Sequence, residues 1–292
     1  MVLFSSFLRK PLKLYWEMMC AGTVDIWPPS DQHALREAMI VLETTSFAAK
    51  LSALVGAPIE TILRLLPESW MDVVYRGSRK AISVAFDLAI SSLAVTSTSS
   101  LSSAAHRFAA GLSGAVGGFF GAGALLAELP ISITIMLRSI AAIASREGED
   151  LTQTEARLAC LEVLALGGDV APMPGVSRYF RLRDALRTSS SEAVRYIATR
   201  GIADKSAPAI AQLVDRIAIQ FGAPLTQKIA AQSMPVIGAV GGSVLNVLFT
   251  DHFQSIAKAH FTIRRLERAH GNESLRAAYQ RVWETWSAER FG

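Results

Sequence analysis

Cysteine is scarce in this sequence. Its 292 residues include only Cys20 and Cys160, which lie far apart in the chain. Disulfide frameworks and zinc knuckles need several cysteines at close spacing, so the sequence excludes both. A reducing compartment is expected, and no metal site is predicted.

Charge is also sparse. Charged residues make up 18% of the chain against 51% apolar residues, and the mean hydropathy is +0.32. The net charge of +4 is spread along the sequence without a dense basic arm, so nucleic-acid binding is not expected. A mild positive charge on an apolar chain fits an anionic lipid surface better.

The signals of β-structure are missing. No Asn-Gly or Asp-Gly turn joins alternating β-branched runs. The apolar runs are long, rich in alanine and spaced at the helical period. The sequence therefore predicts an all-α, multi-helix bundle, and 292 residues are enough for a substantial core.

Cofactor loops and nucleophile motifs are absent too. A phosphate loop needs a lysine after its glycines, and the glycine runs here have none. Ser113 and Ser243 stand beside glycines but outside the G-x-S-x-G frame of a nucleophile elbow. No cofactor and no catalytic serine are predicted.

The chain contains instead a long uncharged run, Phe108 to Ala127, rich in glycine and alanine. Its length would span a bilayer as a helix, but it offers little large apolar surface. Glu128 and Pro130 are predicted to close this run, with Pro130 opening a second helix that carries Arg138. A charge at mid-helix is expensive in lipid, so a buried soluble hairpin and a membrane-embedded hairpin both remain open.

The motif GAVGG occurs twice, at residues 114–118 and 238–242. The repeat predicts two glycine-rich helical hairpins related by pseudo-symmetry and packed through their small faces. A homo-oligomer joined through these faces is an alternative. The predicted helix-contact glycines are Gly114, Gly117, Gly118, Gly121, Gly238, Gly241 and Gly242.

Residues 1–29 are predicted to form a separate N-terminal amphipathic segment. Apolar residues recur in it at helical spacing, with Arg9, Lys10 and Lys13 mostly on other faces and Trp16 at the boundary. This pattern fits an interfacial helix on lipid or a terminal helix docked on the core. The main helical domain is expected over 30–271, with a linker near 167–177, and a C-terminal helix over 272–292.

Start and stop residues predict the other helix boundaries. One helix is expected from Gln32 to Val55, where Gly56 ends it, followed by a short helix from Pro58 and another over 68–93. Further signals are capping boxes at Thr152–Glu155 and Ser189–Glu192, a stop at Gly222, and a cap at Asn272.

Arginines cluster around an aromatic pair after the linker. The cluster fits a solvated helix face or a contact with phosphate or lipid head groups. Its members are Arg178, Arg181, Arg183 and Arg187, with Tyr179 and Phe180 between them.

The best polar constellation for chemistry is Asp251 with His252 and His260. The two histidines are about two helical turns apart, too far to chelate one metal without a partner such as Glu128. One hypothesis is an acid–base site of these residues. The other is a buried ion-pair network that fixes how the hairpins meet, formed by Glu128, Arg138, Asp251 and Arg264.

Three segments of the chain, Ala49–Pro67, Gly123–Leu166 and Pro235–Glu267, resemble the EcsC protein family. The likeness spans roughly Leu35 to Gly271. It implies a bacterial helical protein from a family whose founding member's gene accompanies the genes of an ABC transporter. No catalytic residues are defined for the family, so none carries over.

The expected function is therefore non-enzymatic. The sequence favours a helical protein at the cytoplasmic face of a bacterial membrane, binding lipid or a membrane or transport protein. Peripheral attachment to the inner face is expected because the N-terminus lacks a secretory pattern, and integral insertion is the alternative. A hydrolase using Glu128, Asp251 and His252 is the second hypothesis.

Overall fold

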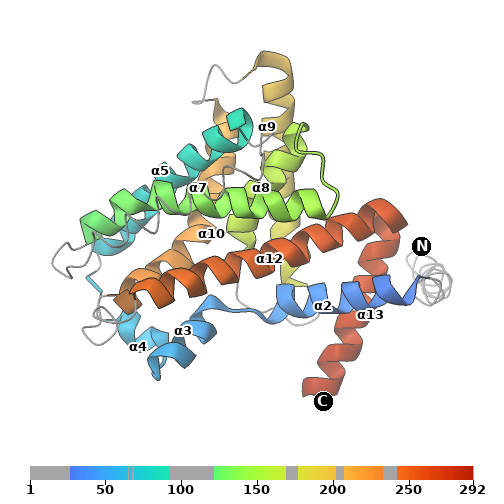
Figure 1. Cartoon of the computed structure of the whole chain (residues 1–292), viewed down its shortest axis with the longest axis horizontal. Helices are drawn as coiled ribbons and strands as arrows, with labels where there is room; N and C mark the ends of the chain where they lie inside the picture. Colours follow the sequence, from blue (N-terminus) through green and yellow to red (C-terminus); the bar gives the residue numbers. More distant parts are fainter. Residues whose placement is uncertain are drawn as a thin grey trace, which may run out of the picture.

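The fold is helical throughout the part of the chain that the structure describes. The computed structural model describes residues 27–64, 66–67, 69–92, 122–168, 177–201, 207–232 and 242–291. These residues form ten helices and no strand, which confirms the all-α prediction (Figure 1). The helices are α2 (Pro29–Thr44), α3 (Phe47–Val55), α4 (Ile59–Leu63), α5 (Ser69–Ser92), α7 (Ala122–Arg146), α8 (Thr154–Leu166), α9 (Arg178–Arg200), α10 (Pro208–Gln232), α12 (Gly242–His270) and α13 (Asn272–Phe291).

The stretch from Gln32 to Val55 forms two helices, so the prediction of a single helix is wrong. α2 ends at Thr44, and the Ser46 hydroxyl caps α3 by accepting a hydrogen bond from the Ala49 amide at 3.3 Å. This cap lets the chain restart as a helix bent by 68° from the first. Gly56 then ends α3 in the left-handed conformation, as predicted.

Two predicted helix breaks are absent. α7 runs through Pro130, and α10 runs through Gly222 and Pro224. A proline within a helix costs about 3 kcal/mol and a glycine about 1 kcal/mol. Buried neighbours, Leu129 beside Pro130 and Phe221 beside Gly222, offset these costs because both side chains enter the core.

The predicted capping boxes are not formed either. α8 begins at Thr154, close to the predicted position, but Asp150 organises the turn before it by accepting hydrogen bonds from Thr152. Ser189 lies inside α9 and donates its hydroxyl proton to the Leu186 carbonyl. A short motif of this kind therefore marks a helix end only where the packing also ends the helix.

α12 lies at the centre of the arrangement. It packs against α2 on one side and against α7 and α8 on the other, and α13 folds back beside its end (Figure 1). α7 and α12 run in the same direction, since Gln254 bonds Ser139 and Arg264 bonds Glu149, both across 115 residues. α5 packs on α10 and α7.

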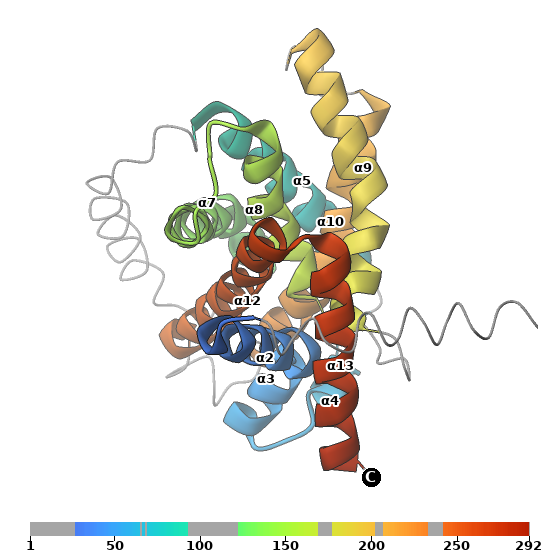
Figure 2. The same ribbon diagram turned by 90° about the vertical axis from the view of Figure 1, so that its right-hand side faces the viewer.

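α9 packs against α8 and α10, and its C-terminal half extends away from the body of the molecule (Figure 2). α13 stands near the other half of α9 in the same view. The region where α8, α9, α12 and α13 meet is therefore reached by helices from distant parts of the chain.

The end of α8 approaches α12 very closely. A Cβ added to Gly167 would lie 2.3 Å from Cε1 of Phe253, so only glycine fits there. Next to it, the imidazole Nε2 of His252 lies 2.8 Å from the Gly167 carbonyl oxygen. This contact fixes α8 against the middle of α12.

Candidate functional site

The N-terminus of α9 is held by a carboxylate from α2. Glu43 accepts hydrogen bonds from the Ser177 hydroxyl at 2.5 Å, the Arg178 amide at 2.8 Å and the Tyr279 hydroxyl at 2.8 Å. A negative charge stabilises the positive end of the helix dipole. α2, α9 and α13 are thereby tied together at one point, which sets the direction of the α9 side chains.

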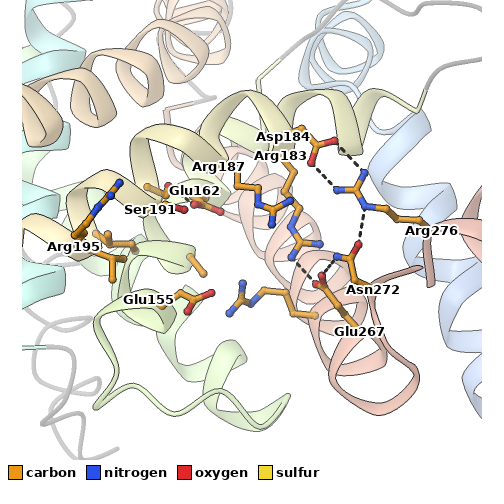
Figure 3. Close-up of a pocket in the computed structure, with 15 residues that line it drawn as sticks. Glu155, Glu162, Arg183, Asp184, Arg187, Ser191, Arg195, Glu267, Asn272 and Arg276 are labelled. Atoms are coloured by element: carbon orange, nitrogen blue, oxygen red, sulfur yellow. Dashed lines mark hydrogen bonds and ion pairs between the residues drawn. The ribbon is translucent and has the colours of Figure 1, made fainter. Parts of the chain in front are cut away.

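A cavity of about 380 Å³ lies between α8, α9, α12 and α13 (Figure 3). α8 contributes Glu155 and Glu162, which are seven residues apart and so share a helix face. α9 contributes three arginines from one face, Arg183, Arg187 and Arg195. The lining holds five arginines and four carboxylates in all, so its formal charge is positive.

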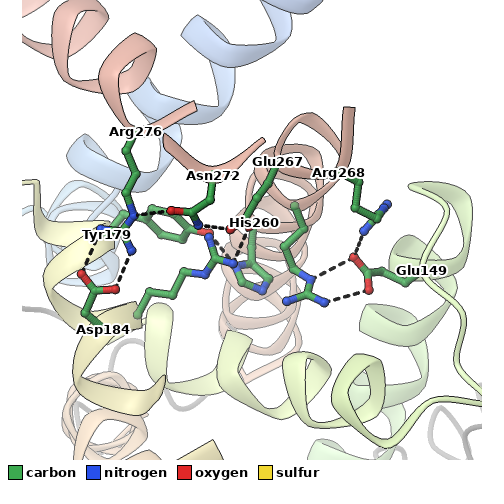
Figure 4. Close-up of polar contacts among 10 residues, drawn as sticks. Glu149, Tyr179, Asp184, His260, Glu267, Arg268, Asn272 and Arg276 are labelled. Carbon is green, nitrogen blue, oxygen red and sulfur yellow. Dashed lines mark hydrogen bonds and ion pairs between the residues drawn. The ribbon is translucent and has the colours of Figure 1, made fainter. Parts of the chain in front are cut away.

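One side of this pocket is a closed polar network (Figures 3 and 4). Arg276 donates two hydrogen bonds to Asp184, at 3.0 and 2.6 Å, and a third to Asn272 at 3.1 Å. Asn272 in turn donates to Glu267, which also accepts from Arg183 at 2.5 Å. These bonds fix the beginning of α13 against α9 and the end of α12.

A second cluster joins the turn after α7 to α12. Arg264 donates two hydrogen bonds to Glu149, at 2.9 and 3.0 Å, and Arg268 also donates to it (Figure 4). Burial raises the pKa of the Glu149 carboxyl, but the two arginines outweigh burial and hold that pKa below its ordinary value. The bidentate geometry fixes Arg264 as one wall of the pocket.

Other charges on the pocket walls have no such partner. Among the side chains that the structure describes, none forms a hydrogen bond or ion pair with the head groups of Arg187, Arg195 or Glu155. The Nη1 atom of Arg183 is buried, and no group in the described ranges bonds to it. The α9 wall therefore presents unused guanidinium donors to the cavity.

Glu162 is the more buried of the two carboxyl groups on the α8 wall and is 9% exposed, whereas Glu155 is exposed. Ser190 donates a hydrogen bond to its carboxylate at 2.5 Å. Burial raises the pKa of the Glu162 carboxyl, and the Ser190 hydroxyl and nearby Arg264 lower it by less. This carboxyl therefore takes up a proton more readily than a carboxyl in water.

The structure does not bring Asp251 and His252 into one site. The side chain of Asp251 is 61% exposed and pairs with Lys50 at 3.2 Å, whereas His252 is fully buried against Gly167. His260 is also fully buried, and its Nδ1 lies 3.0 Å from the Tyr179 hydroxyl. Adjacent residues of a helix point in directions about 100° apart, which explains the separation of Asp251 from His252.

The structure does not bring the described residues of the predicted ion-pair network together either. Arg264 pairs with Glu149, and it lies 13 residues from Asp251, roughly 20 Å along α12. Arg138 is half-buried on α7 and has no ion pair with any side chain that the structure describes. The side chain of Glu128 lies outside the described part of the chain.

Other predicted residues also fall outside the described ranges. They are Arg9, Lys10, Lys13, Trp16, Gly114, Gly117, Gly118, Gly121, Gly238 and Gly241, whereas Gly242 is the first residue of α12.

The arginine cluster noted in the sequence divides into separate roles. Arg178 is buried and bonds the carbonyl groups of Thr45 and Gly168, whereas Arg183 and Arg187 line the cavity. The sequence reasoning missed the opposite wall. Glu155 and Glu162, seven residues apart on the preceding helix, were the signal that could have indicated it.

Two properties of the described residues concern membrane and metal binding. No single described helix is long and apolar enough to cross a bilayer, although α2 and α3 meet this requirement together. α2 buries Leu35, Ala38, Met39 and Leu42 in the core and α3 buries Phe47 and Leu51, whereas Leu54 of α3 is exposed. No group of three or more potential metal ligands occurs among the described residues.

Comparison with known proteins gives one match. The model of the EcsC protein family matches residues 43–266, a range that contains α8, α9 and most of α12. No curated protein and no solved structure shows significant similarity to the chain. Since the family model covers well over half of its length, the chain belongs to the EcsC protein family.

Proposed function

We propose that this protein is a non-enzymatic binding protein that acts at the cytoplasmic face of a bacterial membrane and holds an anionic group between α8 and α9. The observation that carries the proposal is the set of unused guanidinium donors on α9. Arg187 and Arg195 form no hydrogen bond or close ion pair with a described side chain, although the charge of Asp184 acts on Arg187, and Nη1 of Arg183 is buried without a hydrogen-bond partner among the described residues.

Arg187 and Arg195 are exposed, so their guanidinium N–H groups bond water until a ligand supplies stronger acceptors. Arginine recognises phosphate and carboxylate groups because its planar fork matches their oxygens. A volume of about 380 Å³ falls within the range of small-molecule sites.

The same arginines favour a binding role over a catalytic role. Arginine stays protonated under all ordinary conditions, so it orients and neutralises an anion but does not accept a proton. Asp251 and His252, the pair considered for acid–base chemistry, face different environments.

The membrane location rests on the sequence. The run from Phe108 to Ala127 carries no charge, and the basic residues of the N-terminal segment accompany apolar ones at helical spacing. The occupant of the pocket is then a lipid head group or an anionic group that a membrane or transport protein delivers.

A thermal-shift experiment tests the binding role. Inorganic phosphate at constant ionic strength should raise the Tm of the wild-type protein, because it binds only the folded state. Arg187→Gln should reduce the shift, and Arg200→Gln, an exposed change on the same helix outside the cavity, should leave it intact. An equal shift in all three proteins would place the anion elsewhere and refute the proposal.

Cell fractionation tests the location. Protein that stays with membranes through a carbonate wash is embedded, and protein released by high salt is attached through charge. A wholly soluble pool would contradict the membrane part of the proposal.

A further inference from the structure

The two long walls of the pocket carry opposite charges. The α8 wall presents the carboxyl groups of Glu155 and Glu162 and no basic side chain, whereas α9 presents Arg183, Arg187 and Arg195 with one carboxylate, Asp184, which pairs with Arg276. Glu155 and Glu162 lie two turns apart, roughly 10 Å along the helix. Figure 3 shows the head groups of Arg183 and Arg187 in the middle of the view, with Glu155, Glu162 and Arg195 to their left.

These opposite charges do not neutralise one another. The ion pairs that do form in the pocket are Arg183 with Glu267 and Arg276 with Asp184, both between α9 and the α12–α13 corner. Across the cavity, no ion pair within 4.0 Å joins a described residue of α8 to one of α9. Among the described residues, the direct polar contact between the two walls is the hydrogen bond from Ser190 to Glu162, and the arginines of α9 reach the α8 carboxylates only at longer range.

Separated charges of this kind fit a ligand that carries both an acceptor and a donor. A group with phosphate oxygens satisfies the guanidinium N–H groups, and a hydroxyl or ammonium group on the same molecule satisfies a carboxylate. A simple anion would occupy only the arginine side of the pocket. The negative carboxylates across from it would then weaken its binding by repulsion.

We infer that the pocket binds a phosphate ester that also carries an ammonium or hydroxyl group, with the phosphate on Arg183 and Arg187 and the donor group on Glu155. This inference rests on the proposed function, because it names the ligand class of the same pocket. Ser190 and Ser191 line the cavity beside these residues and supply further hydrogen-bonding hydroxyls.

Isothermal titration calorimetry of the full chain tests this inference. The probes are phosphoethanolamine, glycerol 3-phosphate, inorganic phosphate and ethanolamine. Phosphoethanolamine and glycerol 3-phosphate should bind about tenfold more tightly than inorganic phosphate, since one added hydrogen bond to a charged group is worth about this factor. Ethanolamine alone should bind far more weakly than either ester.

Two exposed residues give variants that should fold normally. Glu155→Gln should abolish the preference for the esters while phosphate binding stays equal or improves, and Arg187→Gln should weaken every phosphate-containing probe about tenfold. Glu273→Gln and Arg200→Gln, exposed changes outside the cavity, serve as matched controls that should behave as wild type.

Two negative results have different meanings. Equal affinity for phosphate and for the esters, with no effect of Glu155→Gln, would overturn this inference and leave the anion-binding role standing. Failure of all phosphate-containing probes to bind would overturn the proposed function itself.

The phosphate ester has two possible sources, a lipid head group and a soluble metabolite. Flotation on vesicles of phosphatidylethanolamine with phosphatidylglycerol, compared with vesicles of phosphatidylcholine alone, separates them, because the choline head group has no N–H or O–H donor. Flotation on the first vesicles only, abolished by Arg187→Gln and kept by Arg200→Gln, supports the lipid source. Binding of the soluble esters without such flotation supports the metabolite, and either result supports the inferred class.

Discussion

Removing the carboxylate of Glu43 should destabilise the protein strongly, because three elements share this acceptor. In Glu43→Ala the Ser177 hydroxyl, the Arg178 amide and the Tyr279 hydroxyl all lose their shared acceptor. The Tyr179 amide, at 3.3 Å, loses a longer contact.

The magnitude follows from these bonds. A hydrogen bond to a charged group contributes about 1.5–3 kcal/mol, and a charge at a helix N-terminus adds about 0.3–1 kcal/mol. Bonds that share one acceptor are not additive, and water reaches this half-buried position, so we expect a loss of about 3–4 kcal/mol. That is a large part of a typical folding free energy of about 5–15 kcal/mol.

Urea unfolding followed by circular dichroism measures this loss. Glu37→Ala, on the same helix but with a side chain 68% exposed, is the matched control and should cost about 0.5 kcal/mol or less. Glu43→Gln should fall between the two, because it keeps one acceptor oxygen and turns an amide donor toward the other donors. Equal unfolding free energies for Glu43→Ala and Glu37→Ala would refute the assignment of Glu43 as the anchor of α9.

Three further predictions concern the core. Gly167→Ala should destabilise the protein by about 1–3 kcal/mol, because its methyl group would collide with Phe253. Gly222→Ala should stabilise it by about 0.5–1 kcal/mol, because the nearest neighbour of its methyl group would be 3.8 Å away. Thermal melts of the two variants check both predictions. The raised pKa of the Glu162 carboxyl means that the folded state binds its proton more tightly than the unfolded state, so stability falls as pH rises above about 4.5. Glu162→Gln should remove this loss. The unfolding free energy of the variant minus that of the wild type should therefore be larger at pH 8 than at pH 5. An equal difference at the two pH values would contradict the burial argument. Burial also raises the pKa of the Cys160 thiol, so iodoacetamide should label the Cys160 peptide only after unfolding, as peptide mass spectrometry would show.

Local chemistry predicted much of the helix pattern. Gly56 adopts a positive φ just beyond the end of α3, as its position in the sequence indicates. Pro58 precedes α4 as expected. Such signals succeed because they depend on the backbone of a few neighbouring residues.

The errors arose where packing overrode a local signal. Pro130 and Gly222 look like helix boundaries in isolation, yet both helices continue because the residues around them are buried by other helices. The break before Ser46 was missed because the apolar residues on both sides of it, in α2 and in α3, follow the helical period.

The pocket was predictable only in part. The sequence indicated an arginine-rich helix start, but it could not show which arginines would be neutralised. The partner of Arg183 is Glu267, 84 residues away, and the partner of Arg276 is Asp184, 92 residues away. Which charges remain unused is therefore a property of the tertiary arrangement.

The central position of α12 has a consequence for the protein during its synthesis. α7 and α12 touch through residues 115 positions apart, and α2 also packs on α12. The 124 residues from the end of α7 to the end of α12 take roughly 6–25 s to translate at about 5–20 residues per second. For that time the apolar faces of α2 and α7 have no α12 to cover them, so the nascent chain needs protection from aggregation until α12 has been made.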